Sequence, residues 1–429
     1  MKKMTYIADE ILKNREQRHD FIRPFIDQGN VALSLKANIP GPDKRIFIAY
    51  VVVGYYELVL ADIGYSEKFR LEGADGPSIV YIFKDVDAYE LKQKMVEIEE
   101  YSPYGRLVDL DVHSESLKSM NRKEPRKCLI CGKNAFECSR NQTHSYDDLL
   151  NKVNEIALNT SSELILKAID QAMTYELHLD PKFGLVTPTS MGSHHDMDYQ
   201  TMITAKKAIM PYFNQMFRSG WEARSLSQLF KQARDIGKEA ENAMMLATNG
   251  VNCYKGLIFN LGLLVAATGF SFQKKRPLVD IFDLIKNMTS SLINEFGKSL
   301  DTDGLKAYQQ YGIGGARMEA MKGMPTVQKI SAIINDFEDK TLYQALVEAI
   351  VLSEDTVLAK RAKNPETMAM VKAMFKTLDV TDKDQLEKMT TWCIKKGLSF
   401  GGAADLLVSA IFYRLIDNLW HFQNTALLK

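Results

Sequence analysis

The sequence lacks a net charge and a long uninterrupted apolar segment. Its 429 residues include 54 acidic and 54 basic side chains. No overall field therefore attracts polyanions, and we expect neither a nucleic acid nor a membrane as a partner. The longest apolar stretch, residues 256–270, is interrupted by Asn260 and Thr268. It is too short to span a bilayer, which takes about 20 apolar residues, so we expect a buried helix there.

Cysteine is scarce, and linker-like sequence is missing. Five cysteines, an odd number, and an N-terminus without signal-peptide features predict free thiols in a reducing cytoplasm. No Gly/Ser-rich or Pro-rich linker and no internal repeat interrupts the chain, so any domain junction should be tight. The length is sufficient for two or three domains.

The distribution of secondary-structure patterns predicts two domains. Runs rich in β-branched and aromatic residues predict strands at 31–35, 45–53 and 79–83, and residues 88–100 have helical spacing. After residue 146 almost no strand pattern occurs. Helices are predicted there over 147–177, with breaks at 159–162, and over 226–246, 279–296, 327–337, 342–352, 368–378 and 404–419. We therefore predict an α/β domain over 1–146 and an all-α domain over 147–429.

Residues 192–198 concentrate metal-binding and proton-transfer groups. They read Gly-Ser-His-His-Asp-Met-Asp, and the carboxylates of Asp196 and Asp198 are ligands that Mg²⁺, the usual partner of polyphosphates, prefers. An apolar helical pattern follows. We therefore expect the segment at a helix start, with His194 and Asp198 four residues apart on one face. The alternative is an Asp-rich helix N-terminus with solvated charges.

Four further polar or glycine-rich segments separate the apolar helices. They are residues 248–256, 312–320, 354–356 and 401–405. In the first, backbone N–H groups at a helix entry would bind an anion, and Lys255 adds a positive charge. Turns alone explain a single glycine cluster. Five such segments, with 192–198, predict the lining of one site and hence an enzyme.

An acidic pair occurs in the N-terminal domain. Residues 105–112 alternate apolar and polar side chains. A strand there directs Asp109 and Asp111 to one face, about 6–7 Å apart along the chain. Such a pair can hold Mg²⁺ against a diphosphate leaving group. The alternative is a half-exposed edge strand with two solvated carboxylates.

A Cys/His cluster follows the acidic pair. Cys128, Cys131, Cys138 and His144 have the ligand types and number of a structural zinc site. Their spacing is not that of the common zinc-finger classes. Reduced cysteines packed in a small core are the alternative.

Residues 150–429 resemble triphosphoribosyl-dephospho-CoA synthase. The resemblance rests on Glu176, residues 184–186 and 192–198, Gly250 with Asn252, Lys255 with Gly256, and residues 315–320 and 401–407. It implies a reaction of ATP with 3'-dephospho-CoA that releases adenine and supplies the precursor of the citrate lyase prosthetic group. The chain departs from the family pattern at Phe183, Thr187, Cys253 and Tyr254 and retains Lys182 and Lys255.

The implied reaction needs cations for the triphosphate, a base for the attacking hydroxyl and a proton for adenine. Mg²⁺ on Asp196 and Asp198, with Lys182, Lys255 and Arg317, meets the first need. His194, His195, Glu176 and Glu319 are available as base or acid, and the sequence leaves these roles open. The remaining substrate-binding candidates are Gly250, Asn252, Gly256, Asp355 and Asp405.

Residues 1–146 resemble a second family, apo-citrate lyase phosphoribosyl-dephospho-CoA transferase. The resemblance rests on residues 38–42, 105–112, 125–132 and 144–145. It implies a nucleotidyltransferase-type enzyme that attaches the finished group to a serine of the lyase's acyl carrier subunit and releases diphosphate. Asp109 and Asp111 are then the catalytic candidates, and Arg106 is a substrate-binding candidate.

Two consecutive reactions in one chain favour a bifunctional enzyme. Its expected partners are the acyl carrier subunit, ATP and dephospho-CoA. Two alternatives stay open. One is a scaffold that binds nucleotide and carrier without turnover, and the other is a Mg²⁺-dependent helical nucleotide hydrolase with an unrelated Cys/His module.

Overall fold

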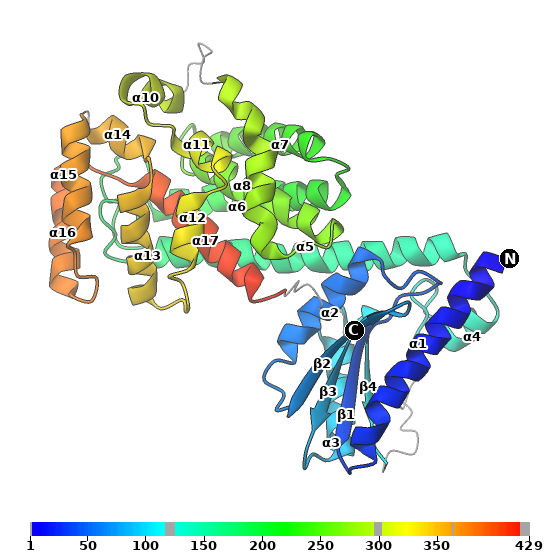
Figure 1. Cartoon of the computed structure of the whole chain (residues 1–429). Coiled ribbons are helices and arrows are strands. Elements are labelled where there is room, and N and C mark those ends of the chain that lie inside the picture. The colour runs from blue at the N-terminus through cyan, green and yellow to red at the C-terminus, as the bar shows by residue number, and fades with distance from the viewer. Residues whose placement is uncertain (1, 116–124, 296–302, 363, 421–429) are drawn as a thin grey trace. The chain divides into compact units, whose positions relative to one another are not determined.

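The chain divides into two compact units. The computed structural model describes residues 2–115, 125–295, 303–362 and 364–420. Unit 1 comprises residues 1–161, 272–277 and 418–429, and unit 2 comprises residues 162–271 and 278–417. The expected boundary at 146/147 coincides with the start of helix α5 (Tyr146–His178), whereas the units divide within that helix. The predicted combination of an α/β part and a helical part is confirmed (Figure 1).

Unit 1 contains a four-stranded antiparallel sheet in the order β2-β3-β1-β4. Its elements are α1 (Lys2–Ile26), β1 (Val31–Ala37), α2 (Phe47–Val59), β2 (Glu67–Gly73), β3 (Gly76–Phe83), α3 (Ala88–Tyr101), the 3-10 turn η1 (Gly105–Leu107), β4 (Val108–His113) and α4 (Ala135–Arg140). The strands predicted at 31–35 and 79–83 and the helix at 88–100 are confirmed. The strand predicted from residue 105 begins at Val108, after η1.

Each face of the sheet has its own helical cover. Ile22 of α1 packs on Ala32, Val80 and Ile82. Because side chains alternate along a strand, Leu33 of β1 and its neighbours on β3 and β4 point to the opposite face. All eight residues of β3 are buried, as expected for a central strand covered on both sides.

The strand predicted over residues 45–53 is wrong, because this segment begins helix α2. Its β-branched residues suggested a strand, but the apolar run continues to Leu60. A run of that length fits a buried helix better than a strand. Nine of the thirteen α2 residues are buried, so it is apolar on nearly all sides and shows little helical periodicity. Neither α1 nor β2 was predicted from the sequence.

Within its described residues, unit 2 contains helices joined by loops and no strand. After α5 come α6 (Tyr199–Glu222), α7 (Leu226–Ala247), α8 (Lys255–Gln273), η2 (Leu278–Asp280), α9 (Ile281–Thr289), η3 (Ser290–Glu295), α10 (Asp303–Tyr311), α11 (Gly315–Met321), α12 (Pro325–Ser331), α13 (Asp339–Leu352), α14 (Thr356–Ala362), α15 (Pro365–Lys376), α16 (Lys383–Lys395) and α17 (Gly401–Asp417). The predicted helices at 226–246, 342–352, 368–378 and 404–419 correspond to α7, α13, α15 and α17. The helix predicted over 279–296 is broken into η2, α9 and η3, and its last residue lies outside the described residues.

Helix α5 has no break at 159–162, contrary to the prediction. Ser161 lies within the helix, and its hydroxyl donates to the carbonyl oxygen of Ala157 at 2.7 Å. A serine bonded in this way satisfies its own polar group inside a helix. The polar residues that suggested an interruption are therefore compatible with a continuous helix.

Helix α8 is the buried helix predicted at 256–270. By length and composition alone it is long and apolar enough to cross a membrane, but 83% of its most apolar window is buried inside the protein. A core helix of a globular protein has these same properties. The prediction of burial is confirmed, and the expectation that the segment is too short to span is wrong, because the helix has 19 residues.

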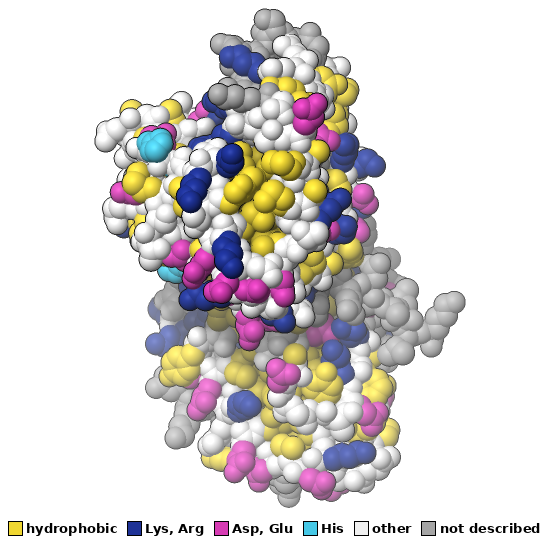
Figure 2. Space-filling view, turned by 90° about the vertical axis from the view of Figure 1, so that its left-hand side faces the viewer, with side chains coloured by type: hydrophobic (Ala, Val, Ile, Leu, Met, Phe, Trp, Pro, Cys, Tyr) yellow, Lys and Arg dark blue, Asp and Glu magenta, His cyan; other side chains and the backbone are white. Residues whose placement is uncertain are grey.

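One outer face of unit 2 combines apolar and charged side chains. Figure 2 shows hydrophobic side chains gathered on this face, with Lys, Arg, Asp and Glu around them. The exposed hydrophobic residues of the outer helices include Met370 of α15 and Ile394 of α16. Patches of this kind are common on proteins of this size.

Candidate active sites

A buried ion pair lies at the end of α5 in unit 2. Glu176 is in the last turn of this helix, and Lys182 follows it in the next loop. The Lys182 ammonium is 1% exposed and donates to both the carboxylate and the backbone carbonyl of Glu176, each at 2.8 Å. Burial lowers the pKa of Lys182, while the charge of Glu176 opposes this shift. The structure thus brings two predicted residues together in a water-excluded position.

Two more carboxyl groups lie near this pair. Asp405 is in the first turn of α17, and burial raises its pKa well above the usual range, with further increases from the charges of Asp355 and Glu176. Asp355 accepts from the backbone N–H groups of Val357 at 2.7 Å and Ala403 at 3.0 Å. Burial raises the pKa of Asp355, and these bonds oppose the rise. Asp405 is therefore a carboxyl that holds its proton to unusually high pH.

Gly256 allows α8 to approach Asp405. A β-carbon at this position would lie 2.1 Å from Asp405 Oδ2, far inside the contact distance. Only glycine permits this close approach without displacing the carboxyl group. We predicted that Lys255-Gly256 and residues 401–405 line one site. In the structure, Gly256 and Asp405 are in direct contact.

The loop before α8 also reaches the carboxyl cluster. Gly250 has φ +91°, a conformation that favours glycine, and Asn252 Oδ1 accepts from the Lys255 N–H at 3.1 Å. The Lys255 ammonium is paired with Glu241 of α7. Tyr254 is buried, and its pKa is raised well above the usual range by burial and by the charge of Glu176. This tyrosine, a departure from the family pattern, therefore lies among the site's acidic groups.

The 192–198 segment is a loop, and helix α6 begins only at Tyr199. The predicted helical spacing of His194 and Asp198 is wrong, because only Asp198 belongs to the helix start. Its carboxylate caps α6 and accepts from the N–H and hydroxyl of Thr201 at 2.8 and 2.6 Å. These bonds lower the pKa of Asp198. The helix begins after His194 because Asp is a favoured N-cap residue and Asp198 occupies that position.

His194 is fixed by neighbours that the sequence did not indicate. Its Nε2 lies 3.0 Å from Ser399 Oγ, and its Nδ1 lies 3.4 Å from Arg361, which also donates to Ser193 O at 3.0 Å. Burial and the Arg361 charge lower the pKa of His194 to about 4. His194 is thus neutral at pH 7 and holds the loop in place, whereas His195 is exposed.

Asp196 and Asp198 are exposed, and their carboxylates lie close enough to Cys253 to change the pKa of its thiol. Burial, then the charges of these two carboxylates, raise the pKa of Cys253 to about 11. The histidine-aspartate loop and the 248–256 loop are therefore neighbours. A thiol with this pKa is protonated at neutral pH and a poor nucleophile.

Arg317 and Glu319 have partners within their own region. Arg317 Nε lies 3.2 Å from Glu295, and the Glu319 carboxylate accepts from the N–H and hydroxyl of Thr326 at 2.7 and 3.1 Å. Burial raises the pKa of Glu319. Nearby, the Gly314 N–H donates to Glu354 at 2.6 Å. This contact joins segment 312–320 to segment 354–356. Asp355 of the latter segment is in turn bonded to α17.

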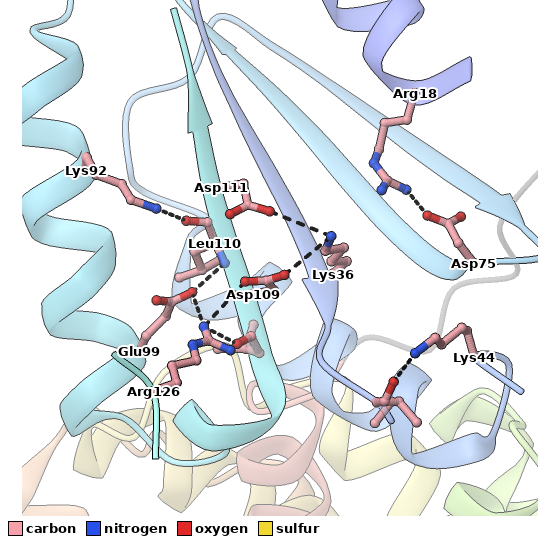
Figure 3. Close-up of polar contacts among 12 residues, drawn as sticks. Arg18, Lys36, Lys44, Asp75, Lys92, Glu99, Asp109, Leu110, Asp111 and Arg126 are labelled. Atoms are coloured by element: carbon pink, nitrogen blue, oxygen red, sulfur yellow. Dashed lines mark hydrogen bonds and ion pairs between the residues drawn. The ribbon is translucent and has the colours of Figure 1, made fainter. Parts of the chain in front are cut away.

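In unit 1, Asp109 and Asp111 lie on one face of edge strand β4, as predicted (Figure 3). Lys36 of the neighbouring strand β1 lies between them, 3.3 Å from Asp109 and 3.7 Å from Asp111. Arg126 approaches the other oxygen of Asp109 at 3.4 Å and also bonds Glu99 at 2.8 Å. The edge-strand alternative is correct about position, but both carboxylates are ion-paired rather than only solvated.

Lys36 and Arg126 contact the acidic pair, and Lys44 lies near Lys36. Burial, then the charges of Arg15 and Lys36, lower the pKa of Lys44 to about 8. Lys36, Lys44 and Arg126 were not among the site residues predicted from the sequence. Alternation along β1 gives the face on which Lys36 lies, but its place opposite Asp109 depends on the strand register, which the sequence does not show.

The remaining predicted residues also lie in unit 1. Arg106, in η1, donates to the backbone carbonyl of Lys127. Cys128, Cys131, Cys138 and His144 converge, with ligand atoms all within 4.8 Å of one another. All five cysteines of the chain are free.

Comparison with known proteins gives two family matches that together cover nearly the whole chain. Residues 162–424 match the family described as ATP:dephospho-CoA triphosphoribosyl transferase, and residues 7–160 match apo-citrate lyase phosphoribosyl-dephospho-CoA transferase. The chain is 32% identical to the protein CitXG of Leuconostoc mesenteroides subsp. cremoris, over 96% of this chain and 97% of the relative. It is also 32% identical to CitXG of Haemophilus influenzae, over 78% of each. A 2-(5''-triphosphoribosyl)-3'-dephosphocoenzyme-A synthase of Haemophilus ducreyi is 34% identical over 66% of this chain and 98% of its own length.

Proposed function

Because the chain belongs to the family of CitX–CitG fusions, and is therefore a transferase of citrate lyase prosthetic-group biosynthesis, we propose two consecutive reactions. Unit 2 joins ATP to 3'-dephospho-CoA and releases adenine. Unit 1 transfers the phosphoribosyl-dephospho-CoA group to a serine of the apo acyl carrier subunit and releases diphosphate. The observation that carries this proposal is the presence of two separate polar centres, one in each unit.

In unit 2, we assign Glu176 as the base and Asp405 as the acid. A hydroxyl of dephospho-CoA forms the new bond to C1' of the ATP ribose while the bond from C1' to adenine breaks. Glu176 accepts the hydroxyl proton, and Asp405, which keeps its proton to high pH, donates to the departing adenine. A buried carboxyl that keeps its proton is suited to act as a general acid. Lys182 holds Glu176 in position through two hydrogen bonds.

The donor set of the 192–198 loop fits Mg²⁺. Asp196 is exposed, and Asp198 uses only Oδ1 in capping α6, so carboxylate oxygens remain for a cation that also binds phosphates and water. Bound Mg²⁺ would neutralise part of the triphosphate charge. Lys255 and Arg317, now paired with Glu241 and Glu295, would exchange these partners for phosphate oxygens. Gly250 and Asn252 shape the loop that presents Lys255.

In unit 1, the acidic pair and its cations suit transfer to a serine hydroxyl. The serine oxygen forms a bond to the α-phosphorus of the triphosphoribosyl group while the bond to the diphosphate breaks. Asp109 or Asp111 accepts the serine proton, or the pair holds Mg²⁺ for the same phosphates. Lys36 and Lys44 offset the negative charge of the departing diphosphate.

Product analysis tests both reactions. The full chain is incubated with ATP, dephospho-CoA and Mg²⁺, with and without apo carrier, and the products are identified by mass spectrometry. We expect free adenine and a triphosphoribosyl adduct only when dephospho-CoA is present, and a modified carrier when it is added. ADP with free phosphate would instead support a nucleotide hydrolase, and unchanged substrates would support a scaffold.

Replacing Asp198 with Asn tests the cation site without removing the helix cap. Asn caps helices about as well as Asp, so α6 should stay intact while one negative charge is lost. We expect adenine release to fall about a hundredfold or more. Asp382→Asn is the matched control, because Asp382 caps α16 in the same way. Equal rates for the Asp198 variant and the wild type would contradict the cation site.

Gly256→Ala tests the close approach of α8 to Asp405. The added methyl group would overlap the Asp405 carboxyl, so we expect adenine release to fall by more than about tenfold and stability to fall by about 1–3 kcal/mol. Gly237→Ala, inside α7, is the control, because its β-carbon would meet its nearest neighbours at 3.7 and 3.8 Å. A fully active Gly256 variant would show that the reaction does not need the close approach of α8 to Asp405.

A further inference from the structure

The residues between β4 and α5 bring four metal-ligating side chains to one point. The sulfur atoms of Cys128, Cys131 and Cys138 and a ring nitrogen of His144 all lie within 4.8 Å of one another. The sulfurs of Cys131 and Cys138 are 3.5 Å apart. A tetrahedral zinc ion with Zn–S bonds of about 2.3 Å separates its sulfur ligands by about 3.8 Å. The cluster therefore already has nearly the dimensions of a zinc site.

His144 gives a second and independent indication of a ligand. Its Nε2 is buried and has no hydrogen-bond partner among the described residues. Buried polar atoms are almost always bonded, because an unpaired one loses its hydration without compensation. A metal ion among the three sulfurs would provide the missing partner. Packing of reduced cysteines alone does not account for this nitrogen.

The backbone around Cys128 forms a tight turn that presents sulfur ligands. The N–H of Cys128 donates to Lys133 O at 2.6 Å, and the N–H of Gly132 donates to Cys128 O at 3.2 Å. Gly132 has φ +71°, which completes the turn.

Helix α4 supplies the third sulfur from a fixed position. Asn134 caps this helix by accepting from the Phe136 N–H at 2.9 Å. Cys138 is buried within the helix, and its carbonyl accepts from the N–H of Thr143 at 3.0 Å. This last bond turns the chain back, so that His144 reaches the three cysteines.

We propose that Cys128, Cys131, Cys138 and His144 bind one structural zinc ion. All four coordination positions are filled by the protein, so none remains for water or substrate, which is the arrangement of structural rather than catalytic zinc. The ligands enclose a segment of 17 residues, here called the Cys/His module (residues 128–144). Its α4 is a helix of only six residues, and such short elements seldom hold a fixed position without a metal or a larger core.

The module also fixes residues that border the acidic pair. Arg126 and Lys127 immediately precede Cys128. Arg126 contacts Asp109, Glu99 and the carbonyl of Val108, and the Lys127 carbonyl accepts from Arg106. Zinc therefore holds Arg126 beside Asp109, which makes Arg126 a positioning residue for the acidic pair. This consequence rests on the proposed function of unit 1, whereas the zinc site itself does not.

Elemental analysis of the full chain, purified without chelators, tests the zinc site. We expect about one equivalent of zinc in the wild type and less than about a tenth in Cys131→Ser and in His144→Ala. Cys253→Ser is the matched control, since it removes a thiol outside the cluster and should retain zinc. A wild-type chain that contains no zinc and takes up none on addition would overturn the proposal. So would a Cys131–Cys138 disulfide found by mass spectrometry in that metal-free chain.

Cobalt substitution tests the ligand set directly, and the two activities test the positioning role. The metal-stripped wild type titrated with Co²⁺ should show the absorption bands of a tetrahedral thiolate site, and His144→Ala should change them. Octahedral Co²⁺ bands in the wild type would overturn the assignment.

Cys131→Ser should lower transfer to the carrier at least tenfold while adenine release stays within about twofold. A normal rate of transfer to the carrier without zinc would contradict the positioning role of Arg126. The zinc site itself would then still be tested by the metal content.

Discussion

Replacing Asp405 with Asn is expected to lower adenine release from ATP at least a hundredfold. Asn has nearly the same shape as Asp, so the contact with Gly256 should be preserved, but it cannot donate a carboxyl proton. The raised pKa of Asp405 also fixes the pH dependence. Activity of the wild type requires the protonated form and should fall as pH rises through this raised pKa. The variant's residual activity should lack that decrease. Initial rates of adenine formation across a pH series measure both effects.

A matched control separates the chemistry from a general effect on α17. Asp417 lies on the same helix and pairs with Arg414 at 2.9 Å, so Asp417→Asn removes a carboxyl remote from Gly256. We expect it to leave the rate and its pH profile unchanged. If the Asp405 variant keeps the wild-type decrease at high pH, another group is the acid. Glu176→Gln should lower the rate at every pH instead, because an amide cannot accept the hydroxyl proton.

The sequence predicted which residues of unit 2 gather, but not how they are arranged. The five polar segments among apolar helices predicted one site that contains Gly256, Asp355 and Asp405, and the family resemblance added Glu176. The prediction that His194 and Asp198 share one face of a helix was wrong, because Asp198 is the N-cap of α6 and the helix begins after it. Capping depends on the local backbone, and a spacing of four residues does not reveal it.

Long-range partners were the least predictable feature. Arg361 fixes His194 from 167 positions along the chain, and nothing near either residue in the sequence indicates the pairing. Helix α2 was mistaken for a strand because its β-branched residues are buried on nearly all sides, which removes the periodicity that distinguishes the two structures. By contrast, the alternation around Asp109 and Asp111 was a local pattern, and the predicted common face is confirmed.

The acidic pair of unit 1 leads to the second large effect. Asp109→Asn and Asp111→Asn are each expected to lower attachment of the prosthetic group to the carrier about a hundredfold or more, while adenine release by unit 2 stays within about twofold. The reason is that each unit has its own polar centre. Mass spectrometry of the carrier measures attachment, and chromatography measures adenine in the same reaction.

Two comparisons make this independence testable. Asp87→Asn, at the N-cap of α3 in the same unit, should affect neither activity, because Asn also caps a helix. Conversely, Asp405→Asn should still attach a preformed triphosphoribosyl-dephospho-CoA at the wild-type rate. Lys36→Met should weaken attachment as well, because Lys36 contacts both carboxylates. If every variant lost both activities together, the two reactions would share one site, and the division of labour between unit 1 and unit 2 would be wrong.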